Sequence, residues 1–193
     1  KESLFFSEIT VDFSGKKKRF VIGLAIIISD TSHITFQLIE VHMSQLITPE
    51  AVHFGQDDLP FVDIGGGNKL KVMQLKVGEG MWIIENIFQA GYEVEPHKHT
   101  GPVYGYTQSG AWKYKEYDYV NRAGSFLYEP AGSFHTLQCI EDNTRVWFQM
   151  YGSNLNLDAD GNITSVADGM GTLEFYYAMC EQAGLPRPNV LVE

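Results

Sequence analysis

The stretch Gly91-Tyr92-Glu93-Val94-Glu95-Pro96-His97-Lys98-His99 decides the fold together with a second stretch, Gly124-Ser125-Phe126-Leu127-Tyr128-Glu129-Pro130-Ala131-Gly132-Ser133-Phe134-His135. His97 and His99 lie two residues apart, so on a β-strand both imidazoles point to the same face. We expect His135 to add a third imidazole from a neighbouring strand. Neutral imidazole suits zinc, copper, iron and nickel, so the sequence predicts a transition-metal site and leaves the metal open.

The first stretch resembles the first motif of the cupin superfamily. That motif runs glycine, five residues, His-x-His, three or four residues, glutamate, six residues, glycine. Four residues of this chain match it: Gly91, His97, His99 and Gly110. The glutamate is missing, because Val103 or Tyr104 occupies its position.

The second stretch resembles the second cupin motif, which runs glycine, five residues, Pro-x-Gly, two residues, histidine, three residues, asparagine. Four residues match it: Gly124, Pro130, Gly132 and His135. Cys139 replaces the asparagine. The resemblance implies an all-β cupin, which is a double-stranded β-helix or jelly-roll-like barrel with the metal inside.

The rest of the chain fits this expectation. Short strand-like runs separated by turn residues predict a sandwich or barrel, with strands at 70–77, 81–88, 91–100, 103–108, 111–119, 125–129, 134–140 and 144–151. One helix is expected over residues 172–183, with Gly184 as its C-cap. Its apolar stripe should pack on the barrel or on a partner subunit, and comprises Leu173, Tyr176, Tyr177 and Cys180.

Composition limits the choice of partners. The 193 residues carry a formal charge of −10, so a duplex nucleic acid is not expected as a ligand. The two cysteines form no CxxC pair, which favours reduced thiols and a cytoplasmic protein. A basic cluster at 16–19 precedes an apolar run at 20–28 that is too short to span a membrane, and no membrane partner is expected.

Met43 reads as a natural protein start. We therefore interpret residues 1–42 as a leader or N-terminal extension, with no functional weight, and residues 43–193 as a single cupin domain. Because exposed strand edges need covering, a homodimer or homotetramer is expected.

A fourth metal ligand is sought among the acidic residues. In the run 111–116, Trp112, Tyr114 and Glu116 alternate with two lysines and should face inward. A buried carboxylate is costly unless it is paired or bound to a metal, so Glu116 is the candidate acidic ligand or partner of a ligand. Glu95 and Glu129 are expected at the surface or in hydrogen bonds. Tyr104 and Trp112 are the expected pocket residues.

Residues 53–165 resemble one branch of cupins, which includes the 2,4'-dihydroxyacetophenone dioxygenases. The resemblance rests on residues 97–101, 112–117, 128–132, 135–137 and 158–161. It implies an Fe(II) dioxygenase that cleaves the bond between a ketone carbon and the adjacent hydroxymethyl carbon. The products would be an aromatic carboxylate and formate. It also implies that His97, His99 and His135 hold the iron, with Glu116 completing the set.

Two alternatives stay open. One is another cupin metalloenzyme, such as a β-diketone dioxygenase or a metal-dependent isomerase, with zinc or another divalent ion in place of iron. The other is a zinc-binding sensor or regulatory cupin of the anti-sigma-factor type, without turnover. Oxygen uptake on aryl ketones and β-diketones, together with metal analysis, separates these classes.

Overall fold

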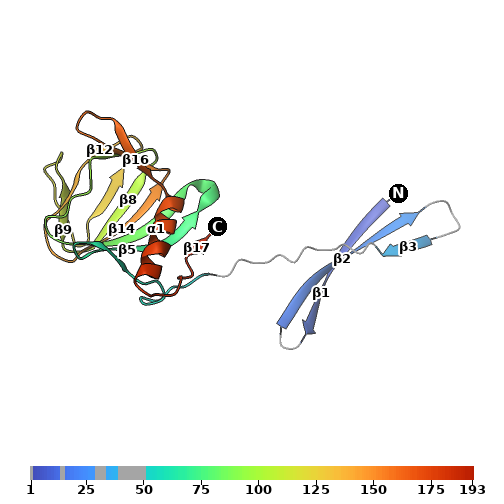
Figure 1. The fold of residues 1–193 in the computed structure, drawn as a ribbon. Coiled ribbons are helices and arrows are strands. Elements are labelled where there is room, and N and C mark those ends of the chain that lie inside the picture. The colour runs from blue at the N-terminus through green and yellow to red at the C-terminus, as the bar shows by residue number, and fades with distance from the viewer. Residues whose placement is uncertain (1, 14–15, 29–33, 39–50) are drawn as a thin grey trace. The chain divides into compact units, whose positions relative to one another are not determined.

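The computed structural model describes residues 2–13, 16–28, 34–38 and 51–193 (Figure 1). The chain divides into two compact units, residues 1–52 and 53–193. The described residues of the first unit form three antiparallel strands in the order β1 (Glu2–Phe13), β2 (Lys16–Ile28) and β3 (Ile34–Leu38). The apolar run at 20–28 therefore belongs to a strand. The domain boundary expected between residues 42 and 43 lies outside the described residues.

Three sheets build the second unit. The largest has the order β11 (Phe126–Glu129), β8 (Val103–Ser109), β14 (Thr144–Tyr151), β6 (Met81–Phe88), β5 (Asn68–Lys76) and β17 (Leu191–Val192), with β4 (Val62–Gly65) also paired to β5. The second has the order β12 (Phe134–His135), β7 (His97–His99), β15 (Asn154–Leu157) and β16 (Ile163–Ala167). The third has the order β10 (Asn121–Arg122), β9 (Ala111–Tyr114) and β13 (Leu137–Cys139).

The core lies on the inner faces of these sheets. Along β14 the side chains alternate in burial, and Val146, Phe148 and Met150 point inward. The period of two is what a strand with one buried face requires. A 3-10 turn, η1 (Val77–Glu79), joins β5 to β6. Among the described residues, no helix is both long enough and apolar enough to cross a membrane.

The expected helix is present as α1 (Gly169–Gln182), with Gly184 just beyond it at φ 69°. Its buried residues are Leu173, Tyr176 and Cys180, three members of the predicted stripe. The Tyr176 hydroxyl donates a hydrogen bond to the Pro60 carbonyl at 2.6 Å, so the stripe packs on this unit's own barrel. The helix begins three residues earlier than expected, because Asp168 caps it by accepting a hydrogen bond from Gly171 N–H.

Gly101 follows the two motif histidines at a point where the backbone approaches another strand. A Cβ on Gly101 would lie 2.7 Å from the carbonyl carbon of Tyr151. We expect Gly101→Ala to lower the free energy of unfolding by about 1–3 kcal/mol, because packed backbone must move apart. Urea denaturation measures this loss.

Gly78→Ala is the matched control, because a Cβ on Gly78 meets nothing within 4 Å among the described residues. We expect this change to stay within about 0.5 kcal/mol of the parent. Equal stabilities for the two variants would show that the backbone around Gly101 accommodates a Cβ without cost.

Candidate metal centre

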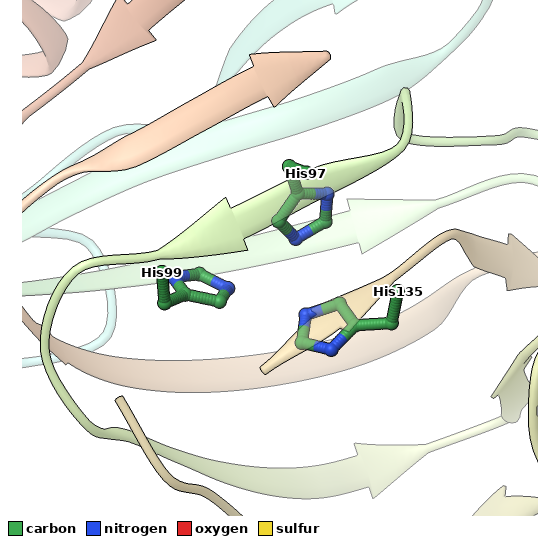
Figure 2. Close-up of side chains that lie close together, drawn as sticks. All are labelled: His97, His99 and His135. Atoms are coloured by element: carbon green, nitrogen blue, oxygen red, sulfur yellow. The ribbon is translucent and has the colours of Figure 1, made fainter. Parts of the chain in front are cut away.

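Two paired strands bring three histidines together. His97 and His99 lie on β7, and His135 lies on β12, directly opposite His97 in the antiparallel register. One ring nitrogen from each histidine lies within 4.8 Å of the others. All three side chains are buried, with relative exposures of 5%, 4% and 1%. Figure 2 shows the three rings turned toward a common point, which is the arrangement a shared cation needs.

The hydrogen bonding of His97 fixes which nitrogen is free. Its Nδ1 lies 2.7 Å from the Glu95 carbonyl oxygen. A carbonyl can only accept, so Nδ1 carries the hydrogen and Nε2 keeps its lone pair. This is how metal-binding histidines are usually oriented. Burial lowers the pKa of His97 and lowers the pKa of His99 to about 4, so both rings are neutral at neutral pH.

Glu129 is the acidic residue that joins the histidines. It ends β11 and is 3% exposed, and its Oε2 lies 3.1 Å from Nε2 of both His99 and His135. The Tyr114 hydroxyl donates a hydrogen bond to its other oxygen, Oε1. Burial opposes ionisation of Glu129, but His135, His99 and Tyr114 outweigh it and lower the carboxyl pKa. The site therefore holds three imidazoles and one carboxylate.

These donors fit a divalent transition-metal ion. Both ring nitrogens of His135 and Oε2 of Glu129 are buried without a hydrogen-bond partner among the described residues. Nε2 of His135 lies 3.1 Å from this oxygen, so the two atoms are close enough to share one cation. Buried polar atoms without partners are costly, and one cation at the common point would satisfy Nε2 of His135 and Oε2 of Glu129. Imidazole and carboxylate donors suit iron and zinc alike.

Glu116 does not lie where the sequence analysis expected it. Strand β9 ends at Tyr114, and the next two residues form a turn, so the inward alternation stops before Glu116. The prediction that its side chain faces inward is wrong, because Glu116 is exposed. Its Oε2 accepts a hydrogen bond from Thr136 N–H at 2.9 Å. Among the described residues, it is Glu129 rather than Glu116 that pairs with the ring nitrogens of His99 and His135.

A cavity of about 170 Å³ lies beside the histidines, and both His97 and His99 line it. Its walls are mainly apolar and include Trp82, Ile84, Phe88, Val103, Phe148 and Met150. An apolar lining excludes water and leaves room for a small organic ligand next to the metal donors.

Tyr104 and Trp112 were expected to line this cavity, and neither does. Tyr104 packs with Tyr128, an exposed residue, with ring centroids 5.4 Å apart. Trp112 is fully buried, and its Nε1 donates a hydrogen bond to Thr107 Oγ1 at 2.9 Å. Both predictions fail because an aromatic residue in a barrel strand can face outward or fill the closed part of the core. Tyr114 is one of the aromatic residues that do line the cavity, and it contacts both Glu129 and His135.

Tyr114 also holds Glu129 in place, and its ring stacks on His135 with centroids 3.9 Å apart. We expect Tyr114→Phe to weaken metal binding by about 10-fold or more, because partners that orient a ligand contribute 10–100-fold to affinity. Competition with a chelating dye measures this affinity.

Tyr92→Phe is the control, since Tyr92 lines the same cavity and makes no side-chain hydrogen bond to a described residue. Its metal affinity should be unchanged. Equal affinities of the two variants would mean that the Tyr114 hydroxyl does not support Glu129.

A sequence model of the family described as the ChrR Cupin-like domain matches residues 49–154. Solved structures are similar as well. An RmlC-like cupin protein from Ralstonia eutropha JMP134 is 29% identical, with 75% of this chain and 95% of that chain covered and a TM-score of 0.69. A protein with a cupin-like fold from the same organism is 27% identical, with 75% and 93% covered and a TM-score of 0.67.

An acetylacetone dioxygenase from Acinetobacter johnsonii is 16% identical, with 68% of this chain and 93% of that chain covered and a TM-score of 0.59. At this identity the likeness shows the fold alone. No curated protein sequence matches the chain. The expected all-β barrel with a C-terminal helix is confirmed by these matches and by the strands and helix described above.

Proposed function

Because this chain belongs to the cupin family described as the ChrR Cupin-like domain, and its donors face a cavity, we propose that it is a metal-dependent dioxygenase. The proposed metal is iron(II). The proposed reaction cleaves the carbon–carbon bond between the carbonyl and the hydroxymethyl carbon of a hydroxylated aryl ketone, such as 2,4'-dihydroxyacetophenone. One dioxygen molecule is consumed, and an aromatic carboxylate and formate are released.

The observation that carries this proposal is that a set of possible metal ligands lies beside an apolar cavity. The donors are the three histidines and Glu129, and two of the histidines line the cavity together with that carboxylate. An apolar cavity of about 150 Å³ can hold benzene, so one of about 170 Å³ suits a single substituted ring. The acetylacetone dioxygenase shows that a dioxygenase can have this fold.

The chain's own residues have three tasks in such a reaction. Imidazoles bind a metal in their neutral form, so three imidazoles and the Glu129 carboxylate would leave one positive charge on a divalent ion, which favours a substrate that binds as an anion. The apolar walls exclude water. Tyr114 keeps its proton between its own oxygen and Glu129 Oε1, because burial raises the pKa of Tyr114 well above its usual value. When bound, iron(II) would supply open positions for substrate oxygens and dioxygen.

In this proposal Glu116 accepts a proton from the substrate. It is exposed, and its carboxylate interacts electrostatically with His97 and His135. Its backbone partner, Thr136 N–H, stabilises the charged form and lowers its pKa against the effect of burial. A charged carboxylate near the histidines can accept the hydroxyl proton of an arriving substrate.

The competing function is a regulatory metal-binding domain without turnover. A regulatory or structural metal site is usually closed, whereas a catalytic site keeps open positions and room for a ligand. The cavity beside the histidines therefore favours the enzyme.

Oxygen uptake tests the proposed function directly. Protein loaded anaerobically with iron(II) or zinc would be mixed with 2,4'-dihydroxyacetophenone, acetophenone or acetylacetone. We expect one oxygen consumed per 2,4'-dihydroxyacetophenone, with formate released, in the iron form alone. Uptake with acetylacetone alone would assign a β-diketone substrate instead. Tight zinc binding without uptake on any ketone would favour the regulatory domain.

The expected homodimer or homotetramer stays a prediction for sedimentation analysis.

A further inference from the structure

Asn86 is a polar residue in the apolar wall of the cavity. It lies on β6 between Ile84 and Phe88, on the inner face of the strand, and all three residues line the cavity. Only 6% of Asn86 is exposed. Its cross-strand neighbours are Leu70 on β5 and Val146 on β14, both buried and apolar. Such a position ordinarily holds an apolar side chain, so the amide calls for a physical reason.

The hydrogen bonding of Asn86 fixes the direction of its amide. The Nδ2 group donates to the Lys69 carbonyl oxygen at 3.3 Å. Since a carbonyl can only accept, the nitrogen must be on that side and the oxygen on the other. Among the described residues, no donor bonds to Asn86 Oδ1. Because Asn86 lines the cavity, a hydrogen-bond donor on a ligand there can bond to this free oxygen.

The strand order places Asn86 on a different wall from the metal donors. The donors come from β7, β12 and β11, and β6 pairs with none of these strands. Within the large sheet, β8 and β14 separate β6 from β11. Across the sheet, Glu129 on β11 pairs with Val103 on β8, Val103 pairs with Met150 on β14, and Met150 pairs with Trp82 on β6. Glu129 and Trp82 therefore lie in the same row of the sheet, and Asn86 lies four residues further along β6. A ligand that contacts both the metal and Asn86 must therefore extend across the cavity.

We propose that Asn86 determines substrate specificity by accepting a hydrogen bond from a hydroxyl at the end of the substrate opposite its metal-binding oxygens. This inference rests on the proposed aryl-ketone function. The cavity would then select rings that carry a hydroxyl remote from the ketone over rings that carry a methyl group of similar size there. Replacing that hydroxyl by methyl removes the hydrogen bond to the Asn86 amide oxygen and places a methyl group against it, and sites that bond a substrate hydroxyl discriminate against such analogues.

Ligand binding tests the inference without turnover. The protein would be loaded with zinc, and the dissociation constants of 4-hydroxyacetophenone and 4-methylacetophenone would be measured by calorimetry. We expect the hydroxyl compound to bind about 10-fold more tightly to the unmodified protein. Equal affinities would overturn the proposal without the need for any variant.

Variants then assign the preference to one residue. Asn86→Leu keeps the volume, removes the acceptor and should abolish the preference. Ile87→Leu, on the same strand but facing away from the cavity, should retain it. A preference that survives Asn86→Leu would overturn the assignment. If Asn86→Leu does not fold, Asn86→Ala replaces it.

The two proposals fail separately. A hydroxyl preference without oxygen uptake by the iron form would leave the Asn86 subsite standing and reject the dioxygenase. Oxygen uptake without a hydroxyl preference would support the dioxygenase and reject the Asn86 subsite.

Discussion

A His135→Ala variant is expected to be purified without metal while its barrel remains folded. The change removes a buried donor whose two ring nitrogens have no hydrogen-bond partner among the described residues. The fold should tolerate this loss, because His135 adds no hydrogen bond to the barrel through its side chain. Partners that merely orient a ligand already contribute 10–100-fold to metal affinity, so losing a ligand should cost more than about 100-fold. Elemental analysis and circular dichroism measure the two outcomes.

His53→Ala is the matched control for this experiment. His53 is exposed and does not belong to the histidine cluster, so its removal should leave the metal content unchanged. His99→Ala should behave as His135→Ala does. Full metal occupancy in either cluster variant would remove that histidine from the site.

A Glu129→Gln variant is expected to bind metal about 10–100-fold more weakly than the parent protein. Glutamine keeps the shape of the side chain but removes the negative charge that lies 3.1 Å from Nε2 of two histidines. It also turns one oxygen into a donor, which would meet either the Tyr114 hydroxyl or the metal. Titration against a chelator of known affinity gives the two dissociation constants.

Glu116→Gln is the comparison that matters most for this prediction. The sequence analysis favoured Glu116 as the acidic partner of the metal, whereas the structure favours Glu129. Because Glu116 is exposed and bonded to Thr136 N–H, its replacement should change metal affinity by less than about threefold. A larger loss for Glu116→Gln than for Glu129→Gln would restore the first assignment.

The three histidines were predictable because short stretches of sequence determine most of their geometry. The spacing of His97 and His99 puts both rings on one face of a strand, and Pro130 and Gly132 mark the turn that leads to His135. The structure then pairs β12 with β7 in a register that sets His135 opposite His97. The resemblance to the two cupin motifs supplied that pairing, which strand periodicity alone does not give.

Glu129 was missed although the sequence carried a signal for it. In β11 the side chains alternate, with Phe126 and Tyr128 exposed and Leu127 and Glu129 buried. The same alternation was applied to the run around Trp112, where it led to Glu116. It fails there because β9 ends at Tyr114, and strand ends are not fixed by periodicity.

The pocket residues could not be chosen from the sequence. Inward-facing aromatics such as Trp112 and Tyr114 have the same pattern, yet one fills the core and the other lines the cavity. What separates them is how the sheets close at each end of the barrel, which depends on packing over long sequence separations. Asn86 could not be identified from the sequence for the same reason, since an isolated amide in a strand gives no local sign that its oxygen lacks a donor.

Anomalous diffraction at the iron edge, from crystals of protein loaded anaerobically with iron(II), tests the central claim most directly. We predict a single peak about 2 Å from Nε2 of His97, His99 and His135, with Glu129 Oε2 facing it. The absence of a peak at full iron loading, or a peak away from His135, would contradict the proposed metal centre.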